Sequence, residues 1–146
     1  MRNIEADRDA ALSELSAVLV AHAVAEEKEV YPELRNRADD VTGEEVEHGS
    51  EEHAEGHAAL LHVLEIGEPE AEEFGEAVEE LTKALAHHLD EEERTILNPA
   101  REEVGDEVRD RLGAAFSEER QRQLDAGCGA IENVRRLVEE SAHVEP

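Results

Sequence analysis

The chain contains the same short pattern twice, and this repeat constrains its fold more than any other feature. HAVAEEKEVYP begins at His22 and HLDEEERTILN begins at His88, 66 residues later (88 − 22). Both copies have the form His-x-x-x-Glu-Glu-basic-x-apolar-apolar. Because a helix turns about once every 3.6 residues, a His and a Glu four positions apart lie on one face. Two such helices facing each other can hold a pair of metal ions between them.

The matching neighbours make this repeat specific. A single His-x-x-x-Glu carries little information in a chain with 40 Asp and Glu residues. Two copies that also share their basic and apolar positions are a much stronger signal than either motif alone. The alternative interpretation is two solvated helix faces.

Apolar residues recur every three or four positions along most of the chain, and no stretch alternates with period two, which predicts an all-α fold. We expect helices over about residues 6–36, between Thr42 and Gly67, and from Pro69 until Asn98-Pro99 ends the third helix. Short connections predict an up-and-down antiparallel helical bundle of three core helices with a C-terminal helical extension. Residues 1–146 are expected to form a single domain.

Within that domain, the metal-binding core is expected at about residues 7–99 and the helical tail at 101–140. Pro32 should kink the first helix or end its regular part, because it lacks a backbone amide. Thr42 with Glu45 reads as a capping box. Ser117 is expected to begin the last helix, over 117–140.

Four of the eight histidines lie on apolar helix faces, and each repeat adds a glutamate there. An unpaired buried carboxylate costs several kcal/mol, so these groups need a compensating charge. A lone buried histidine is usually a core residue bonded to a carbonyl, but six polar residues at one level across three helices favour a metal pair. The predicted metal ligands are His22, Glu26, His53, His57, His88 and Glu92.

The other histidines, and the additional glutamates near the two repeats, fall outside these faces. We expect them in solvent, near helix termini or in ion pairs with neighbouring basic residues: His48, His62, His87, His143, Glu27, Glu91 and Glu93.

The ligand types narrow the choice of metal. Imidazole and carboxylate without thiolate suit iron, manganese or zinc, whereas calcium and magnesium prefer oxygen ligands alone. The single cysteine, Cys128, excludes an internal disulfide and a cysteine-based zinc site.

The charge balance excludes several partners. With 14 Lys and Arg against 40 Asp and Glu, the formal net charge is −26. Such a surface repels nucleic acid and anionic membranes. Acid excess with few lysines is typical of proteins from salt-accumulating cells, where cations screen self-repulsion. We therefore expect a halophile as the source. Because no signal peptide or membrane-spanning run is visible, we expect the protein in its cytoplasm.

Together, the two His-x-x-x-Glu-Glu runs and EEHAEGHAALL between them resemble the hemerythrin-like HHE cation-binding domain family. The resemblance covers about residues 7–99. It implies a four-helix bundle that holds a non-haem di-iron centre, oxo- or hydroxo-bridged, with His22–Glu26 and His88–Glu92 as the two His-x-x-x-Glu pairs. Either His53 or His57 matches the main histidine of the intervening helix.

One departure from the family pattern is expected. The family's first helix, which carries a further histidine ligand, has no counterpart before residue 7. We expect the helix at 117–140 to cover that side, or two chains to pair as a homodimer. Cys128 would then stand near the vacant ligand position or act as a small buried filler.

The resemblance implies iron that binds small ligands such as O2, NO or peroxide. A binding or sensing protein is the leading hypothesis, and no catalytic residues are assigned. The alternatives are an enzyme that consumes peroxide or NO, an iron buffer or regulatory module, and a metal-free structural adaptor.

Overall fold

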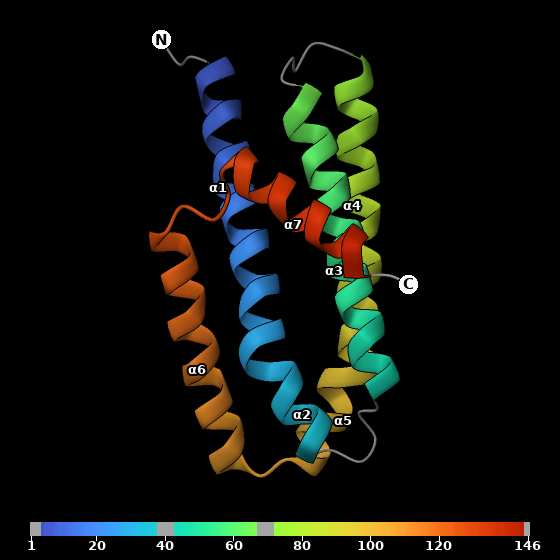
Figure 1. Cartoon of the computed structure of the whole chain (residues 1–146), viewed down its shortest axis with the longest axis vertical. Helices are drawn as coiled ribbons and strands as arrows, with labels where there is room; N and C mark the ends of the chain where they lie inside the picture. Colours follow the sequence, from blue (N-terminus) through green and yellow to red (C-terminus); the bar gives the residue numbers. More distant parts are fainter. Residues whose placement is uncertain (1–3, 38–42, 67–71, 145–146) are drawn as a thin grey trace.

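The computed structural model of the chain describes residues 4–37, 43–66 and 72–144, and within these ranges the regular elements are helices. Three long helices, α1 (Ile4–Ala25), α3 (Gly43–Ile66) and α4 (Glu72–Glu92), run in alternating directions (Figure 1). This arrangement confirms the predicted all-α up-and-down bundle.

The first and third predicted helices each continue through a short π-helical turn. After α1 come η1 (Glu26–Val30) and α2 (Tyr31–Arg37), and after α4 come η2 (Glu93–Leu97) and α5 (Asn98–Glu103). The regular part of the first helix ends at Ala25, before the π turn, and Pro32 lies in the first turn of α2. The prediction that Asn98-Pro99 ends the third helix is wrong, because Pro99 occupies the first turn of α5, where a missing amide costs nothing.

The C-terminal region forms two helices, α6 (Asp106–Asp125) and α7 (Ile131–Val144). The predicted helix over 117–140 is therefore wrong, since Ser117 lies inside α6. The break comes at Gly127, whose φ is +72°. The Gly127 amide donates to the Leu124 carbonyl (3.1 Å) and the Cys128 amide to the Gln123 carbonyl (3.1 Å). These two bonds are a Schellman motif, which favours glycine at its left-handed position.

The two C-terminal helices cover different parts of the bundle. In Figure 1, α6 runs antiparallel to α1 along one side, and it also packs against η1. The shorter α7 crosses the bundle and packs against α3. The tail thus covers α1 as expected, but the helix that does so is α6.

Two apolar clusters form the core. The first joins α1, α3, α4 and the start of α7, and includes Val20, Leu60, Val63, Leu81 and Val134. The second lies at the other end, among α2, η2, α5 and α6, and includes Tyr31, Leu34, Ile96, Ala100 and Leu112. Along α1 and α4, the predicted ligands lie between the residues of these two clusters.

The buried face of α1 includes a polar residue in place of its apolar neighbour. Leu15 is 41% exposed, whereas its neighbour Ser16 is fully buried. Ser16 Oγ donates to the Gly129 carbonyl at 2.7 Å. This hydrogen bond joins α1 to residues 126–130, which connect α6 and α7. Cys128 is buried in the first core cluster, and its thiol donates to the Ala17 carbonyl (3.3 Å). Of the two expected roles, Cys128 therefore has that of a small buried residue filling the core.

Some predicted boundary signals cannot be compared with the structure. The capping box needs Thr42, which lies outside the described residues, as do Gly67 and Pro69. Over the described helices, none is both long enough and apolar enough to span a lipid bilayer.

Candidate metal centre

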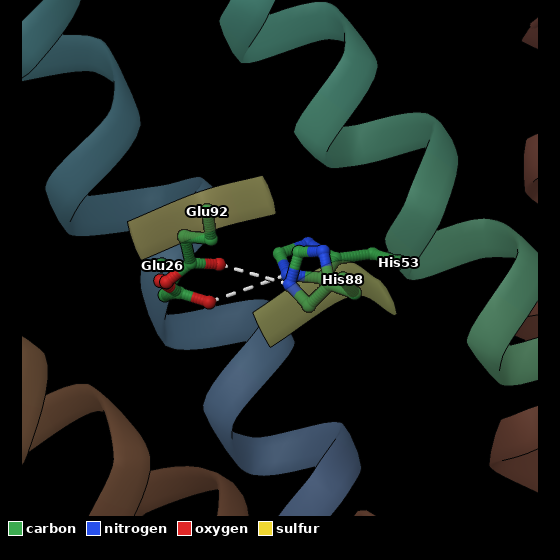
Figure 2. A group of neighbouring side chains, drawn as sticks. All are labelled: Glu26, His53, His88 and Glu92. Carbon is green, nitrogen blue, oxygen red and sulfur yellow. Dashed lines mark hydrogen bonds and ion pairs between the residues drawn. The ribbon is translucent and has the colours of Figure 1, made fainter. Parts of the chain in front are cut away.

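Four of the six predicted ligands converge at one point between the two core clusters (Figure 2). Glu26 is the first residue of η1, His53 lies on α3, and His88 and Glu92 lie at the end of α4. One ligand atom of each residue lies within 4.8 Å of those of the other three, and all four residues are buried. We call these four residues the ligand cluster.

Within the ligand cluster, each imidazole faces a carboxylate. His53 Nε2 lies 3.2 Å from Glu26 Oε1, and His88 Nε2 lies 2.9 Å from Glu92 Oε2. The two imidazole rings are close neighbours, with centroids 4.5 Å apart. Figure 2 shows the carboxylates on one side and the imidazoles on the other.

Both glutamates stand where an α-helix changes into a π turn. Glu26 opens η1, and Glu92 is the last residue before η2. Single π turns occur frequently at functional sites. In the first copy Tyr31, directly after the π turn, is buried and Val30 is only half-buried.

The unpaired nitrogens of the site fit a bound metal ion. Five buried ring nitrogens of four histidines lack a hydrogen bond, namely Nε2 of His22, Nδ1 of His53, Nε2 of His57 and both nitrogens of His88. His88 Nε2 is close to Glu92 but lacks hydrogen-bond geometry. Two ligands at about 2.1 Å from one ion, at right angles, are about 3 Å apart, so this spacing suits shared coordination.

The two glutamates of the ligand cluster differ in acidity. Burial raises the pKa of Glu26, but its contacts with His22 and His53 outweigh burial and hold the pKa far below its usual range. Burial also raises the pKa of Glu92, and the adjacent Glu26 raises it further, against the effect of His88. Two carboxylates this close repel each other when both are ionised, and a cation between them removes that repulsion.

Each imidazole of the ligand cluster also has a carboxylate near its other nitrogen. His53 Nδ1 lies 3.3 Å from Glu27 Oε2, and His88 Nδ1 lies 3.6 Å from Glu52 Oε1. Such outer carboxylates orient metal-binding imidazoles and increase their basicity. Burial would lower the pKa of His53, but Glu26 and Glu27 outweigh it and raise the pKa to about 9. Glu27 is exposed, as one of the predicted alternatives has it, but its carboxylate contacts a buried histidine.

Glu52 is a buried residue that the sequence interpretation missed. Its carboxylate lies 3.2 Å from His87 Nε2 and 3.6 Å from His48 Nε2, so three histidines, including His88, surround it. A sequence signal was available, because His48 and Glu52 form a third His-x-x-x-Glu pair, on α3.

Tyr31 is a second missed residue of the site. Its hydroxyl donates to Glu92 Oε2 at 3.1 Å, and its ring stacks on His53 with centroids 5.7 Å apart. Burial and the charges of Glu26 and Glu92 raise the pKa of Tyr31 far above its usual value, so the hydroxyl stays protonated and acts as a donor.

The remaining two predicted ligands lie beside the ligand cluster. His22 Nε2 is 2.8 Å from Glu26 Oε1, and the His22 ring meets Phe116 of α6 edge to face. His57 is buried one helical turn beyond His53, and its Nε2 has no hydrogen bond. Burial, followed by the charge of His53, lowers the pKa of His57 to about 4. Neither residue belongs to the group of four.

The residues expected outside the site mostly lie there. His48, His62, His87 and Glu93 are exposed, and Glu91 pairs with Arg94 at 3.3 Å. The side chain of His143 lies outside the described residues.

A cavity of about 330 Å³ reaches the ligand cluster from one side. His22, Glu26 and Glu92 line it, together with residues of α5 and α6, whereas His53 and His88 do not. The two imidazoles therefore occupy the side of the carboxylates away from the cavity, and His22 occupies the side that faces it.

A comparison of the sequence with known protein families also indicates a cation-binding domain. The family model described as Hemerythrin HHE cation binding domain matches residues 2–100, which include all six predicted ligands. Searches of curated proteins and of solved structures gave no match. Because the family match spans more than half of the chain and the ligand cluster fits a cation, the chain belongs to the hemerythrin HHE cation-binding family.

Proposed function

We propose that the chain is a non-haem iron protein that holds two iron ions and binds small ligands such as O2, NO or peroxide. The observation that supports this most directly is the buried ligand cluster of two imidazoles and two carboxylates. Imidazole with carboxylate suits iron, and manganese or zinc would accept the same set.

The positions of the histidines suggest how two ions would be shared. His53 and His88 would hold one ion, on the side of the carboxylates away from the cavity. His22 would hold the other, on the side that the cavity reaches. Glu26 and Glu92 would contact both, and His57 is a further candidate ligand for the first ion. When bound, reduced iron supplies the ability to take up O2 or NO.

The chain's own residues would set the conditions for that ligand. Tyr31 donates a hydrogen bond to Glu92, and the carboxylates of Glu27 and Glu52 lie beside the outer ring nitrogens of His53 and His88, which they would orient. The cavity side has fewer protein ligands, so a small molecule would bind there. These features favour binding or sensing of a small ligand.

Metal analysis of ligand variants tests the proposal. Glu26→Ala and His88→Ala should each lower the iron bound per chain to less than about half, because each removes a ligand whose loss typically costs tenfold or more in affinity. His62→Ala is the matched control, since His62 is exposed on α3 and should leave iron content unchanged. Elemental analysis of protein expressed with iron supplied gives the readout.

Spectra then separate the possible roles. A reversible change in the visible spectrum of the reduced protein on adding O2 or NO supports binding or sensing. Repeated consumption of peroxide would indicate an enzyme instead. Iron that is bound and released without a ligand response would indicate a buffer. A folded chain that takes up no iron, with unchanged metal content in all three variants, would contradict the proposal and leave a structural adaptor.

A further inference from the structure

One wall of the cavity beside the ligand cluster is formed by a helix beyond the family match. Its outer wall consists of Arg109, Leu112, Gly113 and Phe116 of α6, whereas the family match ends at residue 100. The ligand cluster belongs to the matched region, but the surface that faces it across the cavity does not.

The cavity is larger than a diatomic ligand requires. Its volume of about 330 Å³ compares with about 30 Å³ for one water molecule in the liquid, and O2 or NO is of similar size. A dry protein cavity of about 150 Å³ can bind benzene. Sites for small organic molecules begin at about 300 Å³, so this cavity has the size of such a site.

The walls are mainly apolar, and the polar groups are at the inner end. Leu34, Leu97, Leu112 and Phe116 provide apolar surface from three helical segments. The imidazole of His22 and the carboxylates of Glu26 and Glu92 form the polar end. A molecule with an apolar body and one small polar group would match both parts.

The charges disfavour an anion. Two arginines line the cavity, but each has a partner on its own helix. Arg109 pairs with the carboxylate of Asp106, which offsets its charge, and Arg101 donates to the neutral side-chain amide of Asn98. The net charge of −26 repels negative ligands from the surface around the cavity.

We propose that this cavity binds a small neutral organic molecule, with an apolar body along α6 and a hydroxyl or hydroperoxyl group directed toward Glu26 and Glu92. This inference rests on the proposed function, because the polar group of the bound molecule would lie beside the proposed metal ions. It extends the proposed ligands from diatomic and inorganic molecules to small organic ones, including organic hydroperoxides.

Gly113 allows the cavity to be filled without disturbing the ligand cluster. A Cβ atom at Gly113 would meet nothing within 4 Å, so Gly113→Leu should be accommodated while occupying space beside Leu112 and Phe116. Gly75→Leu on α4 is the matched control, because Gly75 is also exposed with nothing within 4 Å and does not line the cavity. Both changes replace a helical glycine by a good helix former.

The experiment measures binding of two probes of similar size, 2-phenyl-2-propanol and benzoate, to the full chain by calorimetric titration, with iron content measured for each variant. We expect the alcohol to bind the original chain and the Gly75→Leu variant equally. Gly113→Leu should weaken its binding by about tenfold or more, because the leucine side chain takes the space of the phenyl group. Benzoate should bind more weakly than the alcohol.

Three outcomes would overturn the inference: no binding of the alcohol, equal binding by both glycine variants, or tighter binding of benzoate. Iron content separates this result from the proposed function. Full iron loading without alcohol binding would reject only the cavity ligand, whereas alcohol binding without iron would reject the metal centre and keep the cavity.

Discussion

Tyr31 shows how closely the site is packed at the level of single residues. Its hydroxyl donates to Glu92, its ring stacks on His53, and Gly49 of α3 lies against it. A Cβ atom at Gly49 would stand 3.0 Å from the Tyr31 hydroxyl and 3.3 Å from two ring carbons. Glycine at this position therefore lets the hydroxyl reach the carboxylate.

A double-mutant cycle tests this arrangement. Gly49→Ala should reduce the free energy of unfolding by about 1–3 kcal/mol, because the added methyl group crowds a buried aromatic side chain. Tyr31→Phe should cost about 1.5–3 kcal/mol through the lost hydrogen bond to Glu92. The double variant should lose less than the sum, since removing the hydroxyl relieves the crowding. Urea unfolding measures all four free energies, and strict additivity would contradict the proposed contact.

The ligand residues were predictable from the sequence because spacing determines which side chains share a helix face. His22, Glu26, His88 and Glu92 follow from the repeat alone, and all but His22 belong to the group of four. Glu52 and Tyr31 were missed for different reasons. Glu52 belongs to a His-x-x-x-Glu pair that has no basic and apolar neighbours like those of the repeat. Tyr31 directly follows the π turn of η1, whose register a 3.6-residue period does not describe.

At the level of elements, the connection between α6 and α7 fixes the position of the tail. Ser16 Oγ and Cys128 Sγ join residues 126–130 to α1 through bonds to the Gly129 and Ala17 carbonyls. Gly129 lies so close to α1 that a Cβ atom there would be 2.5 Å from the Ala17 nitrogen and 2.7 Å from its Cα. Only glycine allows this approach of two backbones.

Gly129→Ala should therefore be among the most harmful single-methyl changes in the chain. We expect a loss of at least about 1–3 kcal/mol, because the nearest atoms belong to the backbone of α1 and cannot rotate away. Gly75→Ala, with nothing within 4 Å of its Cβ, should be neutral or slightly stabilising. Melting curves of the two variants provide the comparison. Equal melting temperatures would show that the loop can move from α1.

Helix boundaries were less predictable than helix faces. Apolar spacing continues through Gly127, so periodicity alone places one helix over 117–140. The structure ends α6 at Asp125 because Gly127 adopts a positive φ and completes a Schellman motif. At Pro99 the error was the opposite one: a helix end was predicted, but the helix continues. A proline can stand in the first turn of a helical segment as well as end one.

For the whole molecule, the charge of −26 predicts a strong dependence of stability on salt. Between about 0.1 M and about 2 M KCl the Debye length falls from about 10 Å to below about 3 Å, so repulsion between surface carboxylates is screened. We expect the melting temperature to rise by about 10 °C, which corresponds to about 3 kcal/mol for a chain of this size.

The measurement is a series of melting curves in KCl, repeated in NaCl at equal ionic strength. Screening predicts the same rise in both salts, with most of it below about 1 M. A melting temperature that is independent of salt would contradict the proposed role of self-repulsion, and a rise in one salt only would indicate specific cation binding.

The location of the cavity wall has a consequence for how this protein can diversify. The groups that would hold the metal lie within the family-matched residues, whereas α6 lies after them. If the proposed ligand binds there, substitutions on α6 at Leu112 or Gly113 would change the shape of the cavity while leaving the sequence of the ligand cluster unchanged. One wall of the cavity could then be altered, in evolution or by design, separately from the groups that would hold the metal.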